Sequence, residues 1–299
     1  MPVLFNEKDG PIDIRYDSVF KAVFTKEDPA SQGALSKLIS ALIGREVSIV
    51  TLCINEPPVS NLKDRKIRFD ISCKTENDER VNVEMSLDPR SYEPFRLEYY
   101  SGMLFTGQDI SGTDKDYDDL KRTYQIAILA KERFFEDEEL YHCFEYFDPV
   151  YGIALGGKTR IITLELCKVK KIADKPIEEM NTAELWAYYF EYLTDREKHS
   201  KILAIIYKEE GIAMANEVLQ SISKDEIERE RLMSELKNRL DYQSERAYER
   251  KAGRKEGREE GLREGLKKGQ KKGQQIGEQK IINLLKSGVS PEDILREYS

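Results

Sequence analysis

Two neighbouring runs between residues 66 and 88 alternate strictly between apolar and polar side chains. The runs are KIRFDISCK and VNVEMSLD, and the polar segment TENDER lies between them. A period of two is typical of a strand with one buried face, and a short polar segment between two such runs indicates a turn. The pattern therefore predicts a β-hairpin that carries its polar residues on one face of both strands.

Three polar residues of this hairpin favour a metal site. Asp70 lies in the first run, and Glu84 and Ser86 lie in the second. We predict that the carboxylates of Asp70 and Glu84 project from the same face of adjacent strands, within reach of one metal ion. Carboxylate oxygens are the ligands that divalent cations such as Mg²⁺ prefer.

The remaining periodicities predict an α/β fold. Apolar residues at helical spacing indicate two short helices within residues 16–43 and another helix at 94–106. Strand-like runs follow at 48–54, 122–130, 141–147 and 160–169, and from residue 177 onward the strand signals disappear. We therefore expect residues 14–170 to form a mixed central sheet flanked by helices, followed by a helical C-terminal extension.

The C-terminal tail contains a repeat in which glycine recurs at every fourth position from 253 to 277. This period is close to one helical turn, so the glycines would form a stripe along one helix. Such a charged helix can order by self-association or on nucleic acid, and a flexible solvated tail is the alternative, because each glycine weakens a helix by ~1 kcal/mol relative to alanine. The segment IINLLKSGVSPEDILREY predicts two short amphipathic helices at the end.

Charge and composition divide the chain into three predicted parts: an α/β domain at 1–176, a helical subdomain at 177–243 and the tail at 244–299. Residues 244–280 hold 12 Lys/Arg and 7 Asp/Glu, a local charge of +5 that leaves −13 for the rest of a chain with a net charge of −8. An acidic body with a basic appendage can still hold phosphate backbones.

Several functional classes find no support. No apolar run approaches the ~20 residues that span a bilayer, so we expect no membrane segment. The N-terminus lacks the basic and then apolar layout of a signal peptide. The four cysteines are widely spaced and form no C-x-x-C pair, which favours buried, reduced thiols and a cytoplasmic location.

Several segments in a fixed order resemble a known family. The landmarks are Tyr16-Asp17 with Phe20-Lys21, then Asp70 followed by Glu84-Met85-Ser86, the helix RLEYYS at 96–101 and the strand approach YDDLKRTYQI at 117–126. From about residue 14 to residue 194 the chain resembles the Rpn family of recombination-promoting nucleases and transposases. This family belongs to the PD-(D/E)XK nuclease superfamily, so the resemblance implies a restriction-endonuclease-like fold.

The resemblance also implies a reaction, the metal-dependent hydrolysis of phosphodiester bonds in DNA. Asp70 and Glu84 would ligate Mg²⁺ or Mn²⁺, and the carbonyl of Met85 would complete the protein ligands. Asp17, on the first helix, would hold a second ion or orient a water molecule. A helix N-cap is the alternative role for Asp17.

Ser86 departs from the pattern of the family. The superfamily has Lys two residues after the glutamate and this family usually has Gln, whereas a serine hydroxyl is short and neutral. Arg68 or Lys74 on the same strand could supply the missing charge. The alternative is a weakened or inactive nuclease fold that acts as a nucleic-acid-binding protein, or as an interaction protein that forms homo-oligomers through its C-terminal helices.

Overall fold

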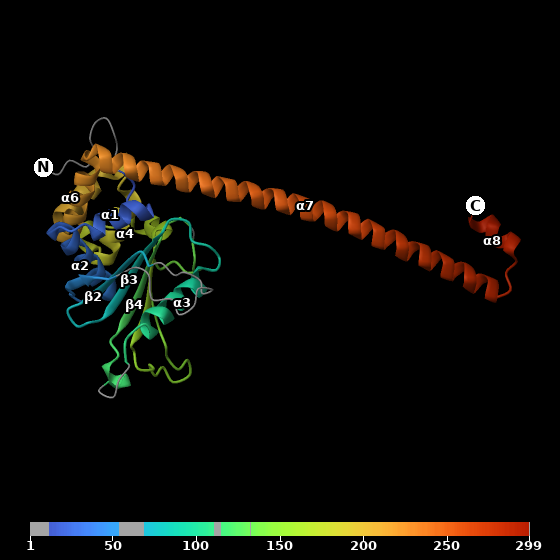
Figure 1. The fold of residues 1–299 in the computed structure, drawn as a ribbon, viewed down its shortest axis with the longest axis horizontal. Coiled ribbons are helices and arrows are strands. Elements are labelled where there is room, and N and C mark those ends of the chain that lie inside the picture. Colours follow the sequence, from blue (N-terminus) through green and yellow to red (C-terminus); the bar gives the residue numbers. More distant parts are fainter. Residues whose placement is uncertain (1–11, 54–68, 111–114, 132, 299) are drawn as a thin grey trace. The chain divides into compact units, whose positions relative to one another are not determined.

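The computed structural model describes residues 12–53, 69–110, 115–131 and 133–298 (Figure 1). The chain forms two compact units, Met1–Leu236 and Lys237–Ser299. The first unit contains the sheet and the candidate site. The predicted three-part division at residues 176 and 243 stays a prediction.

Two helices open the described chain, as the periodicity predicts. α1 spans Asp17–Thr25 and α2 spans Pro29–Ile43. α2 begins where the Asp28 side chain accepts a hydrogen bond from the backbone N–H of Ser31, and it ends at Gly44, whose φ of 80° is the left-handed conformation that glycine adopts without strain. Local sequence thus sets both ends of α2.

Six strands form one mixed sheet, which confirms the predicted fold class. They are β1 (Ile49–Leu52), β2 (Ile71–Thr75), β3 (Arg80–Ser86), β4 (Thr123–Leu129), β5 (Tyr141–Glu145) and β6 (Thr159–Glu165). Their order is β1-β2-β3-β4-β6-β5, so β1 and β5 are the edges. β3, β4 and β6 run parallel, and the pairs β1–β2, β2–β3 and β5–β6 are antiparallel.

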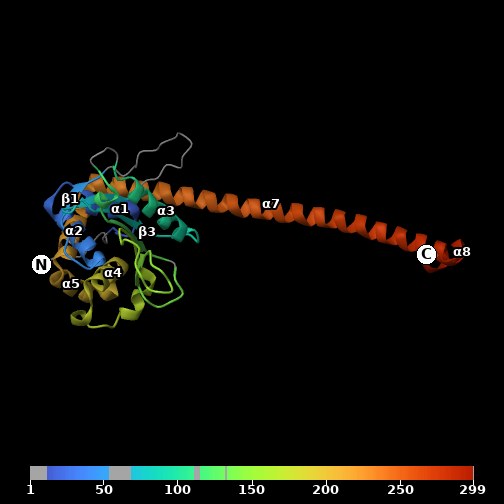
Figure 2. The ribbon, with the colours of Figure 1, turned by 90° about the horizontal axis from the view of Figure 1, so that it is seen from below.

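Helices cover both faces of the sheet (Figures 1 and 2). α1, α2 and α4 (Thr182–Tyr192) pack on the face that carries the apolar set of the hairpin, and α3 (Glu93–Thr106) packs on the opposite face. Phe20 and Phe24 of α1 lie 6.1 Å from Phe190 and 6.0 Å from Trp186 of α4, measured between ring centroids. These aromatic contacts hold α1 in place.

The polar face of β3 is not solvated, contrary to the pattern of a half-buried strand. Asn82 and Glu84 are buried together with the apolar residues that alternate with them, because α3 covers this face. The first run of the predicted hairpin is also shorter as a strand, since β2 begins at Ile71. Residues 66–68 of that run lie outside the described residues.

The rest of the chain is helical, with α5 (His199–Lys208), α6 (Glu210–Lys224), α7 (Glu226–Lys286) and α8 (Pro291–Tyr298). Short 3₁₀ turns occupy Tyr117–Asp119, Leu166–Ile172, Ile177–Glu179 and Arg196–Lys198. The strand predicted at 160–169 therefore ends at Glu165. The first of the two predicted terminal helices is the end of α7, because the chain turns only at Gly288.

All four cysteines are free thiols, as expected, but their burial differs from the expectation. Cys73 is buried, Cys53 and Cys167 are partly buried, and Cys143 is exposed on the edge strand β5. Among the described residues, no helix combines the length and the apolar composition that crossing a bilayer requires.

Candidate functional site

Asp70 and Glu84 stand opposite each other across the β2–β3 pair. Ile71, the first residue of β2, pairs with Val83 of β3. Asp70 immediately precedes Ile71, so the antiparallel register brings it opposite Glu84. Directly opposed residues of antiparallel strands point to the same face, with Cβ atoms about 4.5–5.5 Å apart. The backbone N–H of Met85 donates to Asp70 Oδ2 at 3.3 Å, which ties the two strands together at this point.

The first helix brings a cation and a third carboxylate to Asp70. Lys21 Nζ lies 2.9 Å from Asp70 Oδ1 and 2.8 Å from Asp17 Oδ1. Asp17 and Lys21 are one turn apart on α1, so their side chains share a face. The N-cap alternative for Asp17 is wrong, because Tyr16 occupies the N-cap position without a side-chain cap bond.

Glu84 is buried, and both of its carboxylate oxygens have partners. Arg96 of α3 donates from Nη2 to Glu84 Oε2 at 2.8 Å and also contacts the buried carboxylate of Glu93. Asn82 Nδ2 lies 3.1 Å from Glu84 Oε1 and 2.9 Å from the side-chain oxygen of Gln125 on β4. The site therefore draws on α1, β2, β3, α3 and β4.

The burial of these acids disfavours their charged forms. Burial, reinforced by the neighbouring Asp17 carboxylate and opposed by Lys21, raises the pKa of Asp70 to about 6. Burial also raises the pKa of Glu84 to about 8, although the guanidinium of Arg96 opposes this shift. For Lys21, burial lowers the pKa, but the carboxylates of Asp70 and Asp17 outweigh it and leave the pKa above its ordinary value. The positive charges of Lys21 and Arg96 therefore do not bring the pKa values of Asp70 and Glu84 back to their ordinary range.

The donors at this position fit a hard divalent cation. Within the described part of the chain, no group of three or more His, Cys, Asp or Glu side chains converges on one point. The oxygens of the two carboxylates would leave most coordination positions to water and substrate phosphate, which is how Mg²⁺ commonly binds. A hollow of about 180 Å³, lined in part by Lys21, Asp70 and Ser72, adjoins Asp70 and gives room for water.

One of the two cations that the strand sequence suggested, Lys74, lies away from the site. Ser86 is the last residue of β3 and is partly buried. Lys74 lies four residues along β2 from Asp70 and pairs with Arg80, about 13 Å away at ~3.3 Å per residue. Arg68 lies outside the described residues. Lys21 and Arg96 make the contacts. Both belong to the landmarks of the family resemblance, but the sequence did not predict their contacts with Asp70 and Glu84, because neither residue belongs to the hairpin.

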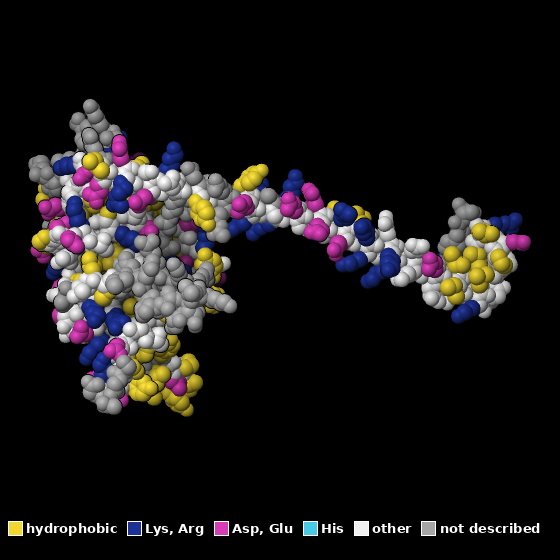
Figure 3. Space-filling model, in the orientation of Figure 1, with side chains coloured by type: hydrophobic (Ala, Val, Ile, Leu, Met, Phe, Trp, Pro, Cys, Tyr) yellow, Lys and Arg dark blue, Asp and Glu magenta, His cyan; other side chains and the backbone are white. Residues whose placement is uncertain are grey.

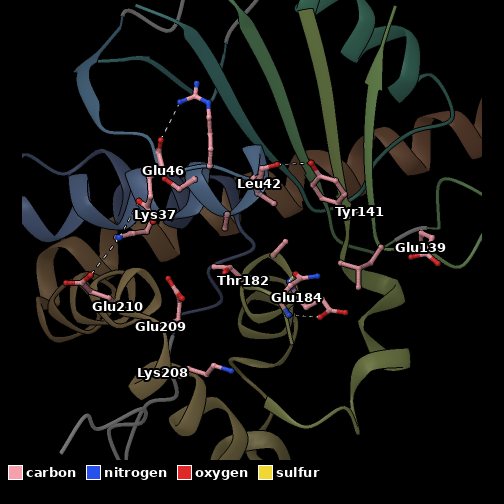
Figure 4. Close-up of a pocket in the computed structure, with 17 residues that line it drawn as sticks. Lys37, Leu42, Glu46, Glu139, Tyr141, Thr182, Glu184, Lys208, Glu209 and Glu210 are labelled. Carbon is pink, nitrogen blue, oxygen red and sulfur yellow. Dashed lines mark hydrogen bonds and ion pairs between the residues drawn. The ribbon is translucent and has the colours of Figure 1, made fainter. Parts of the chain in front are cut away.

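A larger hollow of about 910 Å³ lies away from Asp70 and Glu84 (Figure 4). It lies among the end of α2, the start of α4 and the start of β5, and its lining includes Lys37, Glu46, Glu209 and Glu210. Lys37 pairs with Glu46 at 3.5 Å and with Glu210 at 4.0 Å, so its charges largely satisfy one another. We assign no chemistry to this hollow.

Comparison with known proteins agrees with this geometry. Searches of the curated proteins and of the solved structures gave no match. A family model described as "PD-(D/E)XK nuclease family transposase" matches residues 14–249, which is most of the chain and includes every residue of the candidate site. This membership supports a nuclease or transposase type of function. The chain belongs to the PD-(D/E)XK nuclease family transposases.

Proposed function

We propose that this protein is a metal-dependent DNA endonuclease of the recombination-promoting nuclease and transposase type. The observation that carries the proposal is the pairing of Asp70 with Glu84 on one face of the β2–β3 pair, both with raised pKa values. A buried carboxylate pair with too little positive charge nearby is costly unless it serves binding or catalysis. A divalent cation would supply the missing charge.

In this proposal Asp70, Glu84 and the carbonyl of Met85 hold Mg²⁺ or Mn²⁺. When bound, such an ion would lower the pKa of a water molecule and offset negative charge on the phosphate. Asp17 lies next to Lys21 at the rim of the site, where its carboxylate orients a water molecule or contributes to a second ion. Arg96 and Asn82 fix the orientation of the Glu84 carboxylate through one oxygen each.

Lys21 takes over the role that the residue at Ser86 has in the superfamily. Its ammonium group contacts Asp70 at 2.9 Å, so it lies where a positive charge can stabilise the phosphate. A lysine on a neighbouring helix can supply the same charge as one on the strand. The hydroxyl of Ser86 is then required only to hold water.

The test is a cleavage assay on supercoiled, linear and single-stranded DNA, with Mg²⁺, with Mn²⁺ and with chelator. We expect cleavage only with metal, and none from Asp70→Asn. Cleavage that persists in chelator, or full activity of Asp70→Asn, contradicts the proposal. Metal-independent binding of DNA without any cleavage favours the alternative of a binding protein on a nuclease fold, which the neutral Ser86 supports.

A further inference from the structure

The opposite end of the sheet exposes an unusual number of apolar side chains. The hairpin between β5 and β6 leaves the sheet where β3, β4 and β6 begin, whereas Glu84 lies near the end of β3. Seven large apolar residues of this hairpin are between 41% and 78% exposed: Phe144, Tyr146, Phe147, Val150, Tyr151, Ile153 and Leu155. Figure 3 shows hydrophobic side chains gathered at this lower end of the first unit.

The hairpin that carries these residues is ordered by its own hydrogen bonds. Asp148 Oδ1 accepts from the backbone N–H groups of Val150 and Tyr151 at 2.7 and 2.8 Å, which fixes the turn. Leu155 N donates to Tyr146 O at 2.9 Å, which closes the two arms. The backbone that carries the apolar side chains is therefore ordered, and a partner that binds them has little backbone entropy to overcome.

The charge of this segment argues against nucleic acid and membrane as its partner. Residues 141–157 contain two acidic residues, Glu145 and Asp148, and neither lysine nor arginine. DNA binding draws its affinity from lysine and arginine contacts to phosphates, and helices or loops at membrane surfaces carry the same residues. Glu145 pairs with Arg160 of β6, so the surface is mainly apolar and fits another apolar protein surface.

The surface is also complementary to itself. β5 is a sheet edge, and its five residues include neither the lysine nor the proline that commonly protect an edge from pairing. Beside it lies a notch of about 260 Å³, lined by Phe144, Tyr146 and Ile161 and, at polar positions, by Glu98, Glu145 and Thr159. A protruding apolar hairpin next to this notch allows the same patch on two copies to engage reciprocally, as a twofold interface requires.

The exposed area has the size that a stable dimer needs. Large aromatic side chains bury about 150–250 Å² each, so the exposed parts of these seven residues amount to roughly 800 Å². A standard interface buries about 800 Å² per partner. We propose that a second copy of this chain docks here, and that two chains associate about a twofold axis through their hairpins and β5 edges.

The native Cys143 provides a direct test, because it is exposed and lies at the middle of β5. In the proposed dimer the two Cys143 thiols lie close to the twofold axis, so a short bifunctional thiol reagent should link them. We expect a cross-linked dimer of the full chain that is absent in Cys143→Ser. Light scattering should give twice the 34.7 kDa mass of one chain at micromolar concentration.

Charged substitutions on the hairpin should abolish this association. Tyr151→Glu combined with Leu155→Glu changes two residues that are each 78% exposed, so the fold of the single chain should be kept. Ile153→Lys, at 67% exposed, is an independent second variant, and Tyr207→Glu on α5, at 68%, is the matched control. We expect the hairpin variants to lose at least 90% of the cross-link and the control to keep it.

Three outcomes would overturn the proposal. One is a wild-type chain that neither cross-links through Cys143 nor dimerises. The second is a hairpin variant that cross-links as well as the wild type. The third is a hairpin variant that loses DNA binding at unchanged mass, which would assign the aromatic residues to nucleic acid. Association through the C-terminal helices would change the mass, so the Cys143 cross-link, which reports β5 itself, decides between the two.

Discussion

In most proteins charged side chains face water and apolar side chains are buried, and each end of this sheet departs from one of these rules. Near the end of β3, charged groups that normally face water are buried, and Glu84 is 1% exposed. At the other end, apolar groups that are normally buried face solvent, and Tyr151 is 78% exposed. Buried charge costs stability unless a partner compensates it, and a large exposed apolar patch marks a surface that associates. The first end is thus suited to chemistry and the second to assembly.

The largest expected effect concerns the buried charge at the first end. Glu84→Gln keeps the size of the side chain but removes a metal ligand, so we expect cleavage to fall by ~10³-fold or more. The melting temperature of the metal-free protein should not fall, because a buried carboxylate has been replaced by a neutral group. The control is Glu98→Gln on the exposed side of α3, which should cleave normally. A Glu84→Gln variant that is unfolded rather than inactive would refute this distinction.

Removing Arg96, the cation that pairs with Glu84, should instead lower the free energy of unfolding. Arg96→Met leaves Glu84 and Glu93 buried without their shared cation, which typically costs ~3 kcal/mol in the free energy of unfolding. Urea denaturation at pH 8.5 measures the loss, and it should shrink at pH 5, where Glu84 is protonated. Arg90→Met removes the exposed pair with Asp88 and should cost less than ~1 kcal/mol.

Metal should oppose the pH dependence of stability that Asp70 and Glu84 produce. The folded-state pKa values of about 6 for Asp70 and about 8 for Glu84 lie above the ordinary values of 3.8 and 4.5, so the folded chain binds protons more tightly than the unfolded chain. Without metal, the contribution of these groups to stability therefore falls as pH rises from about 4 to 8.

With Mg²⁺ present, the ionised carboxylates gain a ligand. We expect the rise in melting temperature caused by Mg²⁺ to grow between pH 5 and pH 8 and to vanish in Glu84→Gln. Thermal denaturation over a pH series with and without metal measures both curves. A Mg²⁺ effect that is equal at pH 5 and pH 8 would mean that the metal does not bind these groups.

The role of Lys21 should appear as a smaller change in rate. Lys21→Met should lower cleavage by ~10–100-fold, because it removes a charge next to Asp70. Adding Ser86→Lys to this variant should restore part of the loss, since it returns the charge to the strand. Lys26→Met, five residues further along the chain and just beyond the end of α1, is the control. If Lys21→Met kept full activity, Lys21 would not supply the charge that the lysine of the superfamily supplies at the position of Ser86.

The smallest effect on stability is expected for a substitution in the exposed hairpin between β5 and β6. Tyr151→Ser should change the free energy of unfolding of the single chain by no more than ~0.5 kcal/mol, because the side chain has few contacts to lose. Tyr124→Ser, at a fully buried tyrosine on β4, should cost ~3–5 kcal/mol. Urea denaturation at submicromolar protein concentration separates the two. Equal losses would mean that the hairpin packs against its own chain.

Sequence patterns predicted the strands and the pairing of Asp70 with Glu84, because both follow from a period of two within one continuous segment. They did not predict the burial of Glu84, since the cover comes from α3 and alternation says nothing of a second layer. The contact of Lys21 with Asp70 joins residues 49 positions apart, and no local pattern encodes it. Tyr151 and its neighbours were missed for a different reason, because an apolar run in a sequence is normally a sign of burial.

The packing of α1 against α4 has a consequence for the timing of synthesis. Asp17 and Lys21 are made early, but the helix that carries them rests on Trp186 and Phe190. At roughly 5–20 residues per second, the ~60 residues that separate Gln125 of β4 from Trp186 of α4 take about 3–12 s to translate. During that interval the nascent chain contains every residue of the candidate site without the support that holds α1. The support on which the proposed nuclease activity depends is therefore complete only after most of the first compact unit has been made.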